Sequence, residues 1–182
     1  MRLFHRILAA ALLTFALIGS AFAAELTAEQ QSSLNARVES FDAAMKGNNM
    51  AEIMGVVPPK VLEAIAAKFG VTSEQLVEAT QQQFDEAMKS VTLVSFSMDT
   101  EKAEIVALAD GTPYALIPTE TVMDLGEHGK MRATSSTLGL LDGETWYLVR
   151  VEDAQQVAIL KEVYPAFVDV VFPTGSMEPV TE

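Results

Sequence analysis

The sequence predicts an α+β domain in which N-terminal helices pack on a curved antiparallel β-sheet and a C-terminal helix follows the strands. Apolar residues recur with a helical period from residue 27 to residue 89, and they alternate as in strands from residue 91 to residue 151. Short turns separate the strand segments, and such turns join antiparallel neighbours. Helices that come first and strands that come later indicate the α+β class.

Capping signals mark the starts of two helices. Thr27 and Gln30 have the spacing of a capping box, and so do Thr72 and Gln75. A proline pair that begins at Pro58 suits the first turn of a helix between these two. The sequence therefore predicts helices over residues 27–46, 50–54, 59–69 and 72–89.

The second half of the chain alternates strand segments with turns. Asp110-Gly111 and Asp142-Gly143 are strong turn signals, and residues 126–129 connect the two longest segments. A last helix is expected to begin at Asp153 and to end at Pro165, and residues 167–172 are expected to form a short strand or an apolar strap. The expected strands are 91–98, 103–109, 114–125, 131–141 and 145–151.

Residues 1–23 have the organisation of a secretory signal peptide. Arg2 and Arg6 precede an apolar run over residues 7–18, and Ala21-Phe22-Ala23 supplies the small residues of a cleavage site. The run is too short to span a bilayer. The chain has no cysteine, so it has no attachment site for a lipoprotein lipid. We therefore expect a periplasmic or secreted protein with one domain over residues 24–172 and a flexible tail over residues 173–182.

The charge excludes several classes of partner. The formal net charge is −13, and removal of residues 1–23 takes away two arginines and no acid, which changes it to −15. Nucleic-acid binding needs clustered Lys and Arg, whereas the basic residues here are scattered along an acidic chain. Anionic membrane surfaces would repel the chain for the same reason. No apolar run beyond residue 23 is long enough to cross a membrane.

The residues that commonly carry metal or cofactor chemistry are scarce. His128 is the only histidine beyond residue 23, and without cysteine a zinc site lacks its usual ligands. Met45, Met50 and Met54 cluster in the sequence, but methionine also serves as a flexible core residue. No phosphate-binding glycine loop or nucleophile elbow occurs. We predict no metal and no cofactor.

Several stretches resemble a known superfamily. Phe41–Asn48 is similar to the A-x-x-x-G-D helix end of nuclear-transport-factor-2-like proteins, with Asn48 in place of aspartate, and Asp142–Val149 is similar to their closing strand. This cone superfamily includes ketosteroid-isomerase-like and SnoaL-like proteins. The resemblance implies a cone-like sheet, with a cystatin-like fold as the neighbouring alternative. More narrowly, the chain is similar to uncharacterised small secreted bacterial proteins through residues 58–62, 114–118, 146–151 and 164–165.

The long hairpin is the most informative polar feature. If its turn centres between residues 127 and 128, Thr119 lies opposite Ser136 and Thr121 lies opposite Thr134. Alternation then places these four hydroxyl side chains on one face, where they could line a mixed polar and apolar pocket. We take them, with Trp146, as candidate ligand contacts. The alternative is a solvated sheet in which threonine serves its strand propensity.

Three functions from different classes remain open. The first is a non-catalytic domain that binds a small apolar or amphipathic ligand. The second is an acidic interaction module, such as an inhibitor or immunity protein, whose charge steers a basic partner. The third is an isomerase or dehydratase, for which Glu120 and Tyr114 are the candidate catalytic pair. The sequence favours a function without catalysis. A homodimer through the apolar segment Val168–Phe172 is a further expectation.

Overall fold

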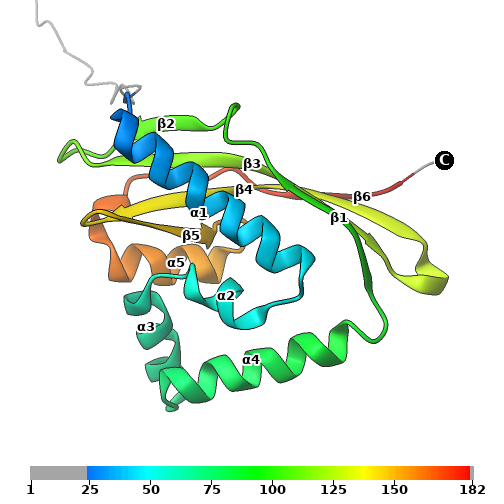
Figure 1. Ribbon diagram of the computed structural model, residues 1–182. Coiled ribbons are helices and arrows are strands. Elements are labelled where there is room, and N and C mark those ends of the chain that lie inside the picture. Colours follow the sequence, from blue (N-terminus) through cyan, green and yellow to red (C-terminus); the bar gives the residue numbers. More distant parts are fainter. Residues whose placement is uncertain (1–23, 181–182) are drawn as a thin grey trace, which may run out of the picture.

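The computed structural model describes residues 24–180, and the predicted signal peptide lies outside them. Four helices precede a curved antiparallel sheet, and one follows five of its strands (Figure 1). The helices are α1 (Ala28–Lys46), α2 (Met50–Gly55), α3 (Pro59–Phe69), α4 (Ser73–Ala87) and α5 (Ala154–Val163). The strands are β1 (Thr92–Met98), β2 (Glu104–Ala107), β3 (Pro113–Asp124), β4 (Lys130–Asp142), β5 (Thr145–Arg150) and β6 (Ser176–Pro179). Short 3₁₀ turns lie at η1 (Gly126–His128) and η2 (Pro165–Phe167).

The predicted fold class is confirmed, and local capping chemistry explains where the helices begin. Thr27 accepts a hydrogen bond from the backbone of Gln30, whose side chain accepts one in return. Thr72 and Gln75 form the same reciprocal pair at the start of α4. Each box satisfies two backbone N–H groups that a helix start leaves without partners. Gly70 ends α3 with a φ of 68°, a conformation that side-chain-bearing residues avoid.

The sheet is built around the long β3–β4 hairpin. The strand order is β1-β3-β4-β5, all antiparallel. β2 pairs with the half of β3 that β1 leaves free, and β6 pairs with the half of β4 that β5 leaves free. The hairpin therefore has a proximal half flanked by β2 and β5 and a distal half flanked by β1 and β6.

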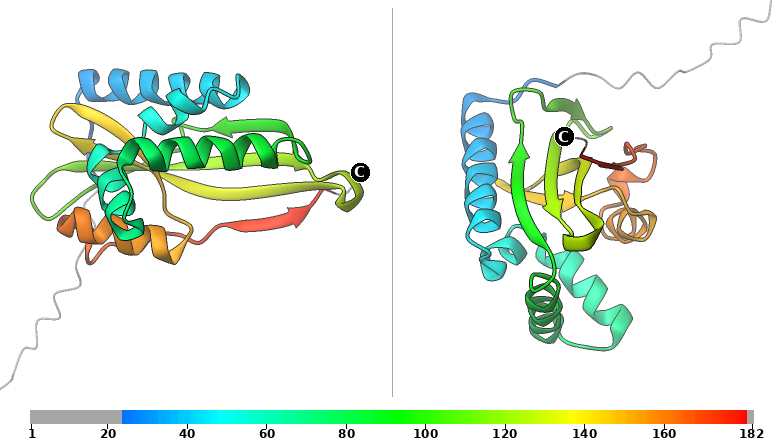
Figure 2. Two further views of the ribbon diagram at one scale, coloured as in Figure 1. Left: turned by 90° about the horizontal axis from the view of Figure 1, so that it is seen from below. Right: turned by 90° about the vertical axis from the view of Figure 1, so that its right-hand side faces the viewer.

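Neighbouring residues of the sheet belong to two cores on opposite faces. On β3, Ala115 and Ile117 pack against Leu34 and Val38 of α1, and we call this the α1 face. Tyr114 points the other way and packs against α5, η2 and residues 170–172, and we call this the α5 face. Figure 2 shows α1 and α5 on opposite sides of the sheet. Helices therefore cover both faces of the sheet, α1 on one and α5 on the other.

A glycine in the sheet lets α1 approach closely. A Cβ placed at Gly139 of β4 would lie 3.2 Å from the Ala115 Cβ and 3.3 Å from the Leu34 Cδ1. Leu34 is completely buried at this point. The indole N–H of Trp146 donates to the carbonyl of Gln30 at 3.0 Å and joins β5 to the first turn of α1. The position of α1 is thus determined by packing and by a partly buried hydrogen bond.

The C-terminal segment differs from the expected loose tail. Ser176–Pro179 forms β6 and pairs with residues 131–134 of β4. The segment before it, residues 168–172, is a strap rather than a strand, with Val171 90% exposed and Phe172 packed on Phe167. Among the described residues, none of the helices combines the length and the apolar character that crossing a membrane requires.

Candidate functional site

The predicted register of the long hairpin is wrong by one residue. Thr119 lies opposite Ser135, not opposite Ser136, and Thr121 lies opposite Ala133. Residues 124 and 130 form the last pair, so the connection has five residues and centres on residue 127. Gly126 and Gly129, with φ values of 64° and 74°, provide the backbone conformations that this odd-numbered connection uses.

The corrected register changes which hairpin side chains share a face of the sheet. A shift of one residue moves a strand's side chains to the opposite side of the sheet. Thr119 and Thr121 therefore lie on the α1 face, whereas Thr134 and Ser136 lie on the α5 face with Glu120. The hydroxyl of Thr134 is paired with Ser176 of β6 at 2.8 Å. The four hydroxyl residues do not line one pocket.

Thr119 instead forms a buried pair that the sequence did not reveal. Its Oγ1 lies 2.8 Å from the Oγ1 of Thr137, and it also donates to the carbonyl of Ile117 at 3.1 Å. Thr119 and Thr137 are both less than 10% exposed. Each hydroxyl has a partner within the sheet, as buried polar groups usually do. This geometry describes a structural pair in the α1 face.

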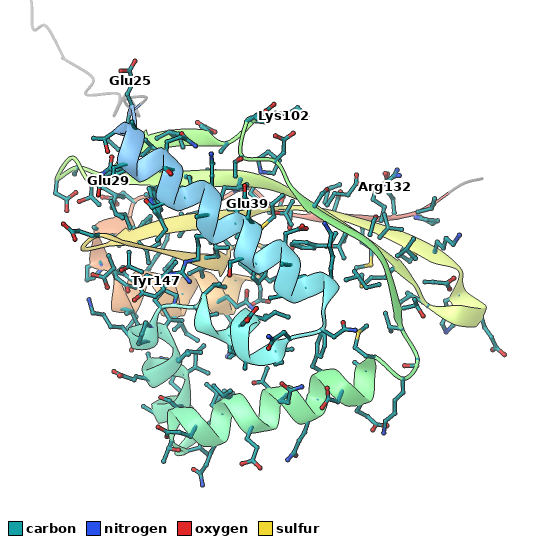
Figure 3. All side chains as sticks on the ribbon, viewed as in Figure 1. Glu25, Glu29, Glu39, Lys102, Arg132 and Tyr147 are labelled. Atoms are coloured by element: carbon teal, nitrogen blue, oxygen red, sulfur yellow. The ribbon has the colours of Figure 1, made fainter. Side chains whose placement is uncertain are left out.

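The other sequence-derived candidates also lie apart. Trp146 is only 2% exposed, because it is packed under α1. Glu120 is 45% exposed and pairs with Arg132 at 3.3 Å on the distal hairpin, where Figure 3 shows Arg132 far from the helices. Tyr114 is buried at the other end of β3, and burial raises the pKa of its hydroxyl.

Glu120 and Tyr114 do not form one active site. They are six positions apart on a continuous strand. At about 3.3 Å per residue, their backbones are separated by roughly 20 Å. Two groups at that distance cannot act on the same carbonyl. His128 lies in η1 with an exposed side chain, and within residues 24–180 no three His, Cys, Asp or Glu side chains gather as metal ligands.

Among the α-helices of the described chain, α4 is the least packed. None of its residues is buried, although it carries an amphipathic pattern with Leu76, Val77 and Phe84 on one face. It packs against α3 and α2 and not closely against the sheet. Figure 1 shows α4 running beneath the sheet, from α3 to the start of β1. Its apolar face is therefore left only partly covered.

A groove of about 620 Å³ lies where α4 passes into β1. Its walls come from the α1–α2 turn, the end of α4 and the first half of β1. Small-molecule sites commonly have volumes of about 300–1,000 Å³. We call this hollow the α4–β1 groove, and its lining residues are Lys46, Asn48, Met88 and residues 91–96.

The lining of the α4–β1 groove combines apolar and polar groups. Met88, Val91 and Leu93 supply apolar surface, while Lys46 and Asn48 supply polar groups. Asn48 adopts a φ of 50°, the one positive value among the described residues other than glycine. Lys46 pairs with Asp42 one turn earlier. A ligand with both apolar and polar parts matches this composition.

A second hollow of about 510 Å³ lies beside the first half of α4. It is bounded by Ala51 of α2 and by the first half of α4. Glu74 and Glu78 stand beside it, and Val77 supplies apolar surface. The two hollows therefore lie at different ends of α4, one along its first half and one beside its C-cap Met88. Neither hollow is lined by the candidates that the sequence suggested.

The charged residues of α4 are all acidic. Within its bounds the helix carries Glu74, Glu78, Asp85 and Glu86 and no basic residue. Most basic residues of the described chain are already paired with acids close by, which leaves the remaining acids uncompensated. The paired ones are Lys46, Lys60, Lys68, Lys89, Lys102, Arg132 and Arg150.

Comparison of the chain with protein-family models, curated proteins and solved structures gave no significant match. The resemblance to nuclear-transport-factor-2-like proteins therefore stays a prediction from the sequence. The α4–β1 groove escaped sequence analysis because its lining comes from three separate segments whose mutual positions the sequence does not give. The one available signal was the long amphipathic segment that ends at Met88 directly before a strand.

Proposed function

We propose that the protein is a non-catalytic binding domain of the periplasm or the extracellular space that takes an amphipathic ligand into the α4–β1 groove. The observation that supports this most is a groove of about 620 Å³ beside Met88, the C-cap of α4, which is an amphipathic helix without a single buried residue. Soluble domains usually bury such a face, and an uncovered one is typical of an interaction site.

The expected gain on binding follows from apolar area. Each 100 Å² of apolar surface that a ligand removes from water contributes about 2.5 kcal/mol. Val94 is 49% exposed and borders the groove, and Met88 is half-buried. Lys46 and Asn48 would orient the polar part of the ligand. Thr119, Thr137 and Trp146 would act indirectly, because they shape the α1 face rather than line the groove.

The alternatives receive different support. An isomerase or dehydratase built on Glu120 and Tyr114 gains nothing from their separation of roughly 20 Å along β3. An acidic interaction module stays compatible with the uncompensated acids, and it differs from the main proposal in the nature of the ligand rather than in the place of binding. Homodimerisation through Val168–Phe172 stays a prediction.

The proposal is tested with the neutral fluorescent probe 1-N-phenylnaphthylamine. We expect its fluorescence to rise on titration with the purified protein and to saturate near one probe per chain. Met88→Lys places a charge in the groove and should weaken binding about tenfold or more, since burying an unpaired charge is costly. Met177→Lys is the matched control, because Met177 is 59% exposed on β6 and lies outside the groove lining.

Native mass spectrometry of the protein isolated from its producing cells identifies the natural ligand. A bound mass that disappears on unfolding, and that is absent from Met88→Lys but present in Met177→Lys, supports the proposal. Equal probe affinity in both variants and the wild type would place the binding elsewhere. Absence of any probe binding would remove the basis for a groove ligand.

A further inference from the structure

β6 is the strand of the sheet with the fewest buried contacts. All four of its residues, Ser176–Pro179, are exposed, whereas every other strand includes a buried residue. Neither hydrophobic core includes a residue beyond Phe172. Backbone pairing with β4 holds β6 in place, together with a hydroxyl pair between Ser176 and Thr134 at 2.8 Å. An element with so few buried contacts opens at a low cost in free energy.

The direction of the backbone groups follows from one hydrogen bond. Val180 donates its N–H to the carbonyl of Lys130 at 2.9 Å, so these two residues face each other across the ladder. In an antiparallel ladder every second residue faces the partner strand. The even-numbered residues of 176–180 therefore turn their N–H and carbonyl groups toward the even-numbered residues of 130–134. Pro179, which has no N–H to donate, lies at a position that faces away from β4.

The edge that accepts β6 is longer than β6 itself. β5 pairs with β4 from Thr137 onward, and β6 pairs with residues 131–134. Ser135 and Ser136 lie between them and pair with neither flanking strand. By the same alternation, Ser136 turns its backbone groups to this side. We call the outer side of residues 130–136 the β4 edge. A segment that runs straight along it makes backbone hydrogen bonds that β6 leaves unmade.

Two side chains of β4 indicate the kind of segment that fits. Thr134 presents the hydroxyl that Ser176 meets in β6. Arg132 lies two residues earlier on the same face, opposite Glu178 in the register. The Nε of Arg132 is shielded from solvent without a hydrogen bond, although Glu120 lies 3.3 Å away. An acid opposite Arg132 can provide a charge-assisted partner. A fitting segment therefore carries a hydroxyl residue two positions before an acidic one.

A partner protein fits the β4 edge better than a second copy of the chain does. A second copy offers the same strand, so it gains no contact over the attached β6, whose effective concentration is about millimolar. Two copies would also bring together chains with a formal net charge of −13 each, and like charges oppose their association. A foreign segment that continues to Ser136 gains pairing that β6 does not have.

We propose that the β4 edge is a docking site for an extended segment of a partner protein and that β6 closes this site in the free chain. The partner segment has a hydroxyl residue two positions before an acidic one. It displaces β6 and adds to the sheet as a strand beside β4. The α4–β1 groove takes no part, so this inference goes beyond the proposed function and stands independently of it.

Proline substitutions in β6 open the β4 edge within the full chain. Glu178→Pro removes an N–H that points to β4 and should release β6. Met177→Pro is the matched control, because the N–H of Met177 points away from β4 and proline is tolerated at such positions. Far-UV circular dichroism should show that both variants are folded, since β6 contributes to neither core.

The probe is a capped, fluorescein-labelled peptide with the sequence of residues 174–180. Fluorescence anisotropy should show binding to Glu178→Pro at least tenfold tighter than to the wild type or Met177→Pro, in which β6 occupies the edge. The same peptide with Ser176→Val or Glu178→Lys should bind about tenfold more weakly, because it loses the partner of Thr134 or of Arg132.

A second peptide tests whether a straighter strand displaces β6. It carries Gly175→Thr, which favours an extended strand that reaches Ser136. We expect it to bind Glu178→Pro about tenfold more tightly than the first peptide does. It should also bind the wild type, because it competes with β6 for the β4 edge.

Amide hydrogen exchange locates the bound peptide. The amides of Arg132 and Thr134 point to the β4 edge, whereas the amide of Ala133 points to β3. The first two should exchange about tenfold faster in Glu178→Pro than in the wild type and should slow again when the peptide is added. The amide of Ala133 should change little in either step.

Four results would overturn the inference. Peptides that fail to bind folded Glu178→Pro would show that the edge accepts no added strand. Equal affinity for all three proteins would place the binding elsewhere. Wild-type amides of Arg132 and Thr134 that exchange only on global unfolding would make β6 a permanent part of the sheet. A wild-type dimer with exchanged β6 strands would assign the edge to a second copy.

Discussion

Replacement of the buried threonine pair tests whether Thr119 is structural. In Thr119→Val, the hydroxyl of Thr137 loses its partner at 2.8 Å, and an unsatisfied buried hydroxyl costs about 1–3 kcal/mol. In Thr137→Val, Thr119 still donates to the carbonyl of Ile117 at 3.1 Å, so we expect a smaller loss of about 0.5–1 kcal/mol. The double variant removes both hydroxyls and keeps the shape of the side chains, and we expect it to be nearly neutral.

Urea unfolding of the four proteins measures this pattern. The free energies of unfolding should show a coupling of about 1 kcal/mol or more, with the double variant more stable than Thr119→Val alone. In a chain of this size, 1 kcal/mol corresponds to about 2–4 °C in Tm. Affinity for 1-N-phenylnaphthylamine should be unchanged. Additive losses, or a loss of ligand affinity without loss of stability, would refute the structural reading of the pair.

Three further changes have expected outcomes. Tyr164→Phe removes the hydroxyl that donates to the Asp142 carboxylate at 2.9 Å and should lower the unfolding free energy by about 1 kcal/mol, measured in urea; an unchanged midpoint would contradict this. Lys60 first, and then Tyr164, hold the pKa of Asp142 below its ordinary value, so this stabilisation is present above about pH 4 and is lost as pH falls through the folded-state pKa. The stability gap between wild type and Asp142→Asn, about 1 kcal/mol for so exposed a pair, should therefore close in acid, and a gap that persists below about pH 3 would exclude the mechanism. Gly139→Ala adds a methyl group 3.3 Å from Leu34 and should cost about 1–3 kcal/mol by thermal unfolding, whereas a neutral result would show that α1 can shift.

The helices and strands could be predicted because their signals are local. Both capping boxes occur as the sequence indicates, and the start of α4 lies directly after Thr72. Turn dipeptides such as Asp142-Gly143 mark hairpins for a similar reason, since Gly143 has a φ of 65°. These features depend on interactions within four residues along the chain, so a single sequence contains them.

The features that sequence analysis missed depend on contacts between distant segments. The register of the long hairpin depends on whether the connection between its strands has an even or an odd number of residues. Gly126 and Gly129 can adopt the backbone conformations of either kind of connection, so the sequence does not decide between them. β6 lacks an apolar alternation and forms because β4 leaves backbone groups free at residues 131–134. The amphipathic pattern of α5 indicates that one side is buried but not which face of the sheet buries it.

The candidate site was predicted less well than the fold for the same reason. Hydroxyl residues on the hairpin look like pocket residues in sequence, yet Thr119 and Thr137 satisfy each other, and Thr134 lies on the other face. The α4–β1 groove lies where the α1–α2 turn, the C-cap of α4 and the first half of β1 meet, and no residue pattern within any one of these segments indicates a hollow between them. A sequence pattern can identify an apolar face of a helix. It does not show whether another segment of the chain covers that face.

Chemical-shift mapping of the ¹⁵N-labelled protein tests the central claim most directly, namely that ligands bind between α4 and β1. The spectrum is recorded during titration with 1-N-phenylnaphthylamine. The account predicts that the largest shifts fall on the residues that line the groove, namely Lys46, Asn48, Met88 and residues 91–96. Largest shifts on the amides of Thr119, Thr121 and Ser135, or on the strap at residues 168–172, would contradict it.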